Sequence, residues 1–301
     1  MLKHLTRLIA TALAASLIHA GGAQAAGPGG SQPRAWVSAL GADAAGCGAI
    51  TTPCRTFQFA HDSVVAPGGT IYVKDSANYG QLVIAHALSI INNGSGTATI
   101  LATSGNAIAI NAGATDAVFI KGLILDGAVT GAVGINFLSG GGLVVENCVV
   151  RGFESGASGG VGIFLDPAST NATFTISDTI VTGNGFAGVY VVPFLPNGLA
   201  TASINGALVR VEATKNTYGV RTENGFGTGS VVVLADQVNA SENGVGFYTS
   251  QSILRLTRSI AAGNFLDGVQ NQGTVYTYGD NAIDGNSVDV SNPMSTANPL
   301  R

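Results

Sequence analysis

The residues best suited to bind a ligand recur at one position of a repeated segment. The pentapeptides GINFL, GIFLD, GVYVV, GVRTE, GFYTS and GVQNQ all begin with glycine, and the third residue of each is predicted to point outward. We call this position the outer stripe, and it consists of Asn136, Phe164, Tyr190, Arg221, Tyr248 and Gln270. Aromatic rings can stack on sugar rings, and arginine can hydrogen-bond hydroxyls or a carboxylate. Phe164, Tyr190, Arg221 and Tyr248 are therefore the candidate ligand-binding residues, unless the rings only stack on one another and strengthen a sheet.

A second column, in the first strand of each repeat, alternates in charge. Its structural interpretation is a ladder of ion pairs in which each aspartate lies between two arginines. Exposed pairs of this kind are worth only about 0–1 kcal/mol each. Its functional interpretation is a groove that brings carboxylates and an arginine to a reacting sugar. The column reads Asn147, Asp178, Arg210, Asp236, Arg258 and Asp280.

Neither column has the two adjacent like-charged carboxylates that glycoside hydrolysis or a calcium site would need. Glu154, Asp166 and Glu223 lie in predicted loops near the outer stripe and are a weaker lead. The segment 183–188 matches GxGxxG, but a β-pattern follows it where a dinucleotide site needs a helix. We therefore assign no catalytic residue, no metal site and no cofactor; calcium is left open, with no ligand cluster identified.

The elements that position these residues repeat every 20 to 30 residues. Turn asparagines recur at intervals of 32, 27, 21 and 22 residues, and a matching series of glycines begins the second strand of each copy. Such a period indicates a solenoid whose coils must stack to bury their apolar faces. Short β-branched strands between Gly/Asn turns favour a parallel β-helix, in which stacked amides can bond from coil to coil. The asparagine ladder comprises Asn184, Asn216, Asn243, Asn264 and Asn286.

The first 25 residues have the pattern of a secretory signal. Lys3 and Arg7 precede an apolar core at 8–18, and Ala23-Gln24-Ala25 fits a cleavage site. Cleavage near Ala25 would remove two positive charges and move the net charge from −4 to −6. We expect a secreted, periplasmic or surface protein with no membrane span in the mature chain. Its acidic balance argues against nucleic acid as a partner.

The segment before the repeats is predicted to form an N-terminal cap. Cys47 and Cys54 lie seven residues apart in a Gly/Pro-rich loop of an exported chain, which favours a disulfide. Residues 53–64 are predicted to form a short amphipathic helix that begins after Thr52. Cys148 is interpreted as a buried side chain.

Two runs resemble a known family. CRTFQFAHDSVVAPGGTIYVKDSANYG (54–80) looks like the cap and first coil of secreted right-handed parallel β-helix proteins, the pectate-lyase-like superfold, and YGDNAIDGN (278–286) resembles the last coil of a bacterial subset. The resemblance implies an all-β, right-handed parallel β-helix of three short sheets and about eight to nine coils, exported from a bacterium. The expected organisation is a signal at 1–25, lead-in and cap at 26–68, β-helix at 69–290 and tail at 291–301.

The resemblance implies a fold more than an activity, because many chemistries share this scaffold. Lyases of the superfold hold calcium beside an arginine or lysine base, and its hydrolases use paired aspartates; neither pattern maps onto this chain. We expect a module that binds polysaccharide along the outer stripe. The alternatives are a polysaccharide lyase or glycoside hydrolase acting on a polyuronide, and a structural or adhesive surface solenoid. The sequence does not indicate an oligomeric state.

Overall fold

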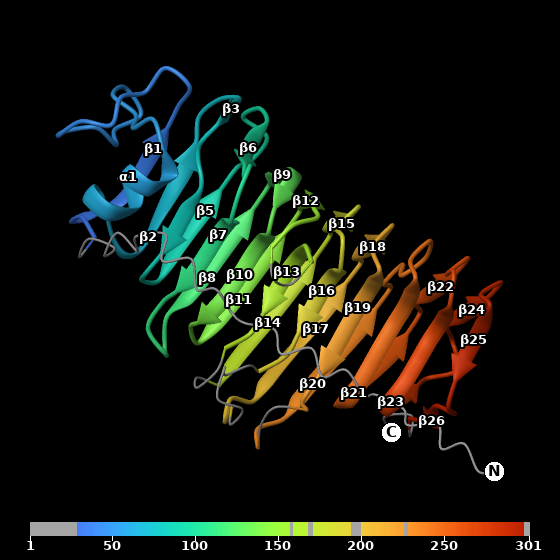
Figure 1. The fold of residues 1–301 in the computed structure, drawn as a ribbon. Helices are drawn as coiled ribbons and strands as arrows, with labels where there is room; N and C mark the ends of the chain where they lie inside the picture. Colours follow the sequence, from blue (N-terminus) through green and yellow to red (C-terminus); the bar gives the residue numbers. More distant parts are fainter. Residues whose placement is uncertain (1–28, 157–158, 168–170, 194–199, 226–227, 298–301) are drawn as a thin grey trace, which may run out of the picture.

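In a computed structural model the chain winds into an elongated stack of parallel strands (Figure 1). The structure describes residues 29–156, 159–167, 171–193, 200–225 and 228–297, so the predicted signal sequence lies outside the described residues. Every strand pair in the ladders is parallel, and each strand pairs with its equivalent one turn later. The predicted parallel β-helix is therefore confirmed.

Three sheets run along the stack, and one turn passes through each in order. β21 and β23 bend from the third sheet into the first without a break, so these two sheets are continuous. An isolated bridge at Asn239 takes the place of one strand in the second sheet.

The first sheet contains β1 (Gln32–Val37), β2 (Val65–Val73), β5 (Leu88–Ile91), β8 (Ala117–Lys121), β11 (Gly142–Glu146), β14 (Ala172–Ser177), β17 (Ile204–Val209), β20 (Val231–Asp236), the second halves of β21 (Val245–Thr257) and β23 (Asp267–Thr277), and β26 (Ser295–Thr296). The second contains β3 (Ala77–Asn78), β6 (Ala98–Leu101), β9 (Leu123–Gly131), β12 (Val149–Phe153), β15 (Ile180–Thr182), β18 (Glu212–Thr214), β22 (Ile260–Ala262) and β24 (Ala282–Asp284). The third contains β4 (Leu82–Ile84), β7 (Asn106–Asn111), β10 (Val133–Ser139), β13 (Val161–Leu165), β16 (Ala187–Val191), β19 (Tyr218–Glu223), the first halves of β21 and β23, and β25 (Val288–Ser291).

The core consists of columns of side chains that point inward from all three sheets, and one of these columns follows the repeat glycines. The residue after each repeat glycine is buried, as the alternation of strand side chains requires. These residues are paired in register from coil to coil. The column consists of Ile135, Ile163, Val189, Val220, Phe247 and Val269.

The asparagine ladder is a chain of side-chain hydrogen bonds at the corner between the second and third sheets. From Asn216 onward, each amide oxygen accepts the backbone N–H of the ladder asparagine one coil earlier, at 2.9–3.0 Å, and that of Asn184 accepts the Phe153 N–H at 3.2 Å. The left-handed turn position is the residue before the asparagine, for example Gly183 or Lys215, and not the asparagine itself. Asparagine is required for its amide, which satisfies buried backbone donors.

The glycine series makes room for this ladder. A Cβ on Gly188 would lie 2.7 Å from the Gly219 carbonyl oxygen and 2.9 Å from the Asn216 amide nitrogen. Gly219 stands in the same relation to Gly246 and Asn243. The glycine series and the asparagine ladder therefore pack as one unit, since any side chain at the glycine would displace the neighbouring asparagine amide.

The charged column differs from its predicted register. Asp178, Arg210 and Arg258 occupy the left-handed turn after the first-sheet strands, but Gln237 takes that place in the coil between the arginines. Asp236 is one residue earlier, at the end of β20. The charges form two separate pairs, Arg210 with Asp178 at 2.6 Å and Arg258 with Asp236 at 2.5 Å. The hydrogen bond from Arg210 holds the pKa of Asp178 below its usual range.

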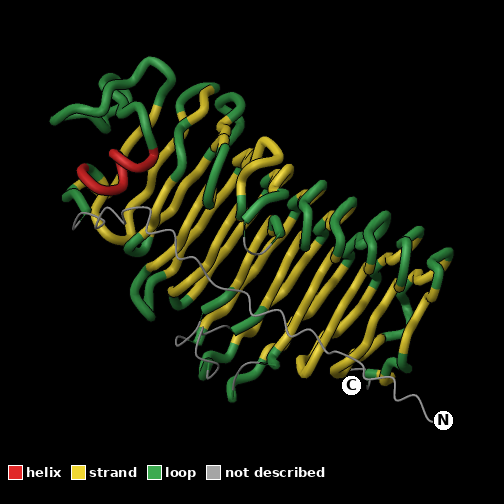
Figure 2. The backbone as a smooth tube through the Cα atoms, in the orientation of Figure 1, coloured by secondary structure: helices red, strands yellow, loops and turns green. Residues whose placement is uncertain are grey.

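The N-terminal end is covered by helix α1 (Phe57–Ser63), which lies at the blue end in Figure 1 and is drawn in red in Figure 2. Thr56 caps it, not Thr52, and its hydroxyl accepts the Phe59 N–H. The helix begins late because Cys54 bridges to Val37 as part of the sheet ladder. Phe57 and other apolar residues of the helix are buried on the first coil, as a solenoid cap requires.

Two smaller predictions concern the cysteines and the tail. The predicted disulfide between Cys47 and Cys54 is confirmed, and Cys148 is buried. Burial raises the pKa of the Cys148 thiol to about 11. Ser295–Thr296 of the tail pairs with β23, and residues 298–301 lie outside the described residues.

Candidate functional site

The outer stripe lies on the outer face of the third sheet. Phe164 on β13 is paired with Tyr190 on β16, Tyr190 with Arg221 on β19, and Arg221 with Tyr248 on β21. Asn136 and Gln270 extend the row at its two ends. The four candidate ligand-binding residues therefore stand on successive coils of one surface.

The stripe is less exposed than predicted. Tyr248 is only 9% exposed and the Arg221 side chain 16%. Two aromatic residues outside the stripe, Phe186 and Tyr218, cause this burial. The Arg221 guanidinium carbon lies 4.4 Å from the centre of the Tyr218 ring and 5.0 Å from that of Phe186. The arginine is held in an aromatic cage and does not extend freely into solvent.

The sequence pattern did not single out Phe186 and Tyr218, because the predicted orientation covers only the residues after each repeat glycine and these two stand before it. A signal for them exists, since each stands two residues after a ladder asparagine, Asn184 or Asn216. The two rings reach the stripe from different positions, since Tyr218 is the first residue of β19 and pairs with Ala187, whereas Phe186 precedes β16. They pack edge-on against each other, with ring centres 5.5 Å apart.

The aromatic rings form one continuous surface over four coils. Phe164 and Tyr190 stack almost parallel, with centres 5.0 Å apart and planes 8° from each other. Phe186 meets Tyr190 edge-on at 5.6 Å, and Tyr218 meets Tyr248 at 5.4 Å. All of these rings except Tyr248 are partly exposed. We call the five rings and Arg221 the aromatic platform: Phe164, Phe186, Tyr190, Tyr218, Tyr248 and Arg221.

Glu223 neutralises the platform's arginine. One carboxylate oxygen accepts a hydrogen bond from Arg221 at 2.5 Å, and the other accepts the Tyr190 hydroxyl at 2.5 Å. Burial lowers the pKa of Arg221, but the Glu223 carboxylate outweighs it and the net shift is upward. Burial and the bond to Glu223 both raise the pKa of Tyr190. Glu223 is the last residue of β19 and does not lie in a loop, contrary to the sequence prediction. Its carboxylate fixes the side chains of Arg221 and Tyr190.

A second outward column runs beside the stripe, two residues further along each strand. It contains Asp166, Val192, Glu223, Ser250 and Gln272, with the last three paired in register. Burial raises the pKa of Asp166 to about 8, so this carboxyl is largely protonated at neutral pH. The side-chain amide oxygen of Gln272 accepts the Tyr248 hydroxyl at 3.2 Å. The aromatic row is therefore bordered by hydrogen-bonding groups at Asp166 and from Glu223 to Gln272, with the buried, apolar Val192 between them.

Three polar atoms on this face are buried and have no hydrogen-bond partner among the described residues. They are Asn136 Oδ1, Asp166 Oδ1 and Arg221 Nε. Buried polar atoms in folded proteins are nearly always paired, so unpaired ones call for an explanation such as a functional role. Seven such atoms occur among the described residues, so this face shares the feature with other parts of the molecule.

The three loop carboxylates of the sequence analysis do not converge. Glu154 lines a hollow of about 460 Å³ at the corner between the second and third sheets, together with Lys215 and Phe265, whereas Asp166 and Glu223 lie at the other end of the third-sheet strands. Asp166 and Glu223 stand two coils apart in one column, about 10 Å between backbones. Among the described residues, no three His, Cys, Asp or Glu side chains gather as a metal site would require.

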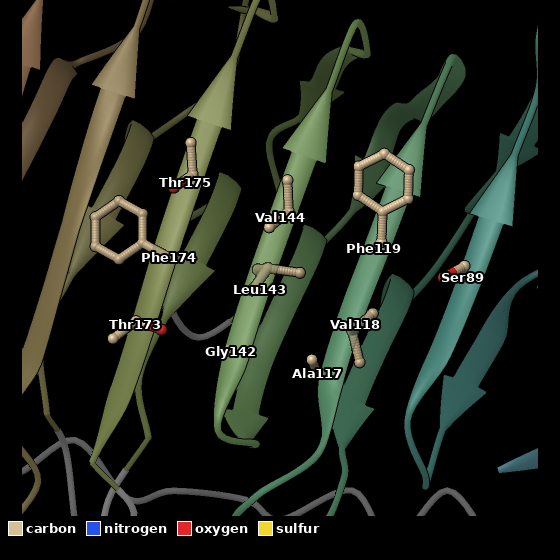
Figure 3. A pocket seen from close by; sticks show the side chains of 10 residues that line it. All are labelled: Ser89, Ala117, Val118, Phe119, Gly142, Leu143, Val144, Thr173, Phe174 and Thr175. Atoms are coloured by element: carbon tan, nitrogen blue, oxygen red, sulfur yellow. The ribbon is translucent and has the colours of Figure 1, made fainter. Parts of the chain in front are cut away.

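The first sheet carries a different surface hollow, shown in Figure 3, of about 280 Å³. Phe119, Val144 and Thr175 stand in register across its floor. The labelled residues include no titratable side chain, so the hollow offers no acid–base chemistry. The GxGxxG segment lies at the turn before β16, and the element that follows is a strand.

Comparison of the chain with protein-family models, with curated proteins and with solved structures finds no match. No described helix is long and apolar enough to cross a membrane.

Proposed function

We propose that this protein is an exported β-helix module that binds polysaccharide along the outer stripe of its third sheet. The observation that carries the proposal is the aromatic platform. Its rings stand on successive coils, partly exposed, beside a row of carboxyl, amide and hydroxyl groups. A pyranose presents apolar C–H faces and a rim of hydroxyls, so it needs flat rings and hydrogen-bonding groups side by side.

The cage around Arg221 supports this role because it makes the platform rigid. Cation–π contacts contribute roughly 0.5–2 kcal/mol each, more when they are desolvated. Tyr190 and Arg221 share Glu223 as a partner, so their positions are coupled. Rings that are already ordered lose little conformational entropy when a ligand binds. The disulfide supports the exported part of the proposal, since such bonds persist in oxidising compartments.

The test is a labelled polysaccharide panel probed with the chain from residue 26 onward. Binding should fall at least about tenfold in Phe164→Ala and Tyr190→Ala, the loss that about 1.4 kcal/mol produces. Tyr276→Ala is the matched control, because Tyr276 also contacts an arginine, Arg255 at 4.8 Å, but on the first sheet. Binding that is unchanged in both platform variants, or absent from the whole panel, would contradict the proposal.

A second candidate function, a polysaccharide hydrolase or lyase, rests on Asp166. A carboxyl with a pKa raised to about 8 is protonated at neutral pH and can act as a general acid. Glu223 in the same column accepts hydrogen bonds from Arg221 and Tyr190. Release of new reducing or unsaturated ends by the wild type, abolished in Asp166→Asn, would support this function. Failure of both tests leaves a structural or adhesive solenoid.

A further inference from the structure

The charge of the binding face bears on the kind of glycan that it can accept. Within the described residues of the outer stripe and the second column, Arg221 is the only cationic side chain. The second column contributes two acids, Asp166 and Glu223, and no base. A ligand carboxylate that settled on this face would therefore need Arg221 as its counter-ion.

Arg221 is not available for that role. Its guanidinium is paired with Glu223 and surrounded by four rings, which lie between 4.4 and 5.3 Å from it. Both oxygens of Glu223 are occupied, so the carboxylate cannot turn away without breaking bonds to Arg221 and Tyr190. Removing one member of such a buried pair leaves a charge uncompensated, which is costly.

The remaining polar groups suit uncharged hydroxyls. Gln272 is exposed, Ser250 is partly exposed, and Gln270 extends the stripe beside them. Amides and hydroxyls both donate and accept, so they pair with sugar hydroxyls in either direction. Asp166 changes from a donor to an anion as it ionises, and the anion would repel a nearby uronate.

We infer that the glycan bound along the outer stripe is an uncharged polysaccharide, not a polyuronide. The inference rests on the proposed function, because it names the ligand class of the same face. Stacking on the platform provides the apolar contact, and the second column binds the hydroxyls. The paired arginine fixes the rings without selecting for a negative charge.

The experiment compares two synthetic oligomers by isothermal titration calorimetry. One is a neutral hexose hexamer, and the other has the same linkage with each C6 oxidised to a carboxylate. We expect the neutral hexamer to bind at least about tenfold more tightly, because like charges brought together at an interface cost affinity. Its affinity should not change between low and high salt, since no ion pair forms with the ligand.

Glu223→Gln tests the cause of this selectivity. The variant leaves Arg221 charged without its carboxylate, so the preference for the neutral hexamer should shrink at least about threefold. Glu242→Gln is the control, since Glu242 is exposed at a turn and pairs only loosely with Lys215 at 3.9 Å. Circular dichroism verifies that each variant is folded. The comparison of the two hexamers on the wild-type protein does not depend on either variant. Equal binding or a preference for the oxidised hexamer overturns this inference but not the proposed function; binding of neither overturns both.

Discussion

The side-chain oxygen of Asn216 accepts two hydrogen bonds from Asn184, one from its backbone N–H and one from its amide nitrogen, both at 3.0 Å. Asn216 in turn donates its own N–H to Asn243. This relay joins adjacent coils at a corner where the side chains are buried. It fixes the vertical alignment that places the platform residues one above another.

Asn216→Ala should therefore destabilise the fold. The substitution leaves two buried donors of Asn184 without an acceptor, and each such loss costs about 1–3 kcal/mol. Urea unfolding followed by circular dichroism measures the change in free energy. Asn205→Ala, at an exposed position of β17, is the control and should be close to neutral. Equal effects of the two substitutions would show that the ladder does not stabilise the stack.

The glycines that face the ladder should not tolerate even a methyl group. In Gly188→Ala the new Cβ would meet the Gly219 carbonyl at 2.7 Å, and overpacking of this kind costs roughly 1–3 kcal/mol. Gly225→Ala is the control, because its Cβ would have only a distant contact at 4.0 Å. A thermal midpoint for Gly188→Ala as high as that of Gly225→Ala would refute the steric argument.

The cap should weaken in acid through a pair of stacked histidines. The rings of His61 and His86 lie 4.0 Å apart, and His61 Nε2 accepts the Ala85 N–H, so His61 is neutral in the folded state. Burial lowers the pKa of His61; the contact with Asp62 opposes this shift, and that with His86 adds to it. A histidine with a lowered pKa takes up protons more readily when unfolded, so its stabilising effect is present above about pH 6.5 and declines as the pH falls below that value.

The measurement for the histidine pair is the melting temperature between pH 7.5 and pH 5. We expect a fall in the wild type and a smaller fall in His61→Phe, which has no proton to take up at this position. His61→Phe will be less stable at pH 7.5, since Ala85 loses its acceptor. Only the slope with pH tests the prediction, and parallel slopes would count against it.

The thiols offer a chemical test of the cap and the core. Native protein should show no thiol that reacts with Ellman's reagent, because Cys47 and Cys54 are bonded and Cys148 is buried with its pKa raised to about 11. Denaturant without reductant should expose one thiol, and denaturant after reduction three. Three thiols without reductant would mean that the disulfide is absent from the protein in solution.

The periodic residues made the fold predictable from the sequence. Asn184, Asn216 and Asn243 recur with glycines at a fixed offset, so the winding and the inward or outward sense of each strand follow from alternation. The register of Asp236 was not predicted, because Gln237, and not an aspartate, takes the left-handed turn of that coil.

The electrostatics of the site were less accessible to sequence analysis. The sequence did not show that Arg221 is paired and enclosed, because its partners come from other coils or from other positions on its own strand. Phe186, Tyr190 and Tyr248 approach it only after the chain has wound, whereas Tyr218 and Glu223 lie on its own strand, β19. The sequence around Asp166 likewise gave no sign of the burial that raises its pKa.

The most direct measurement of the binding face is nuclear magnetic resonance of the aromatic rings during titration with neutral hexose oligomers. The account predicts shifts in the ring signals of Phe164, Phe186, Tyr190 and Tyr218, and none in Tyr72 or Tyr276 on the first sheet. Shifts confined to the first sheet, or no shifts with any oligomer that binds, would contradict it.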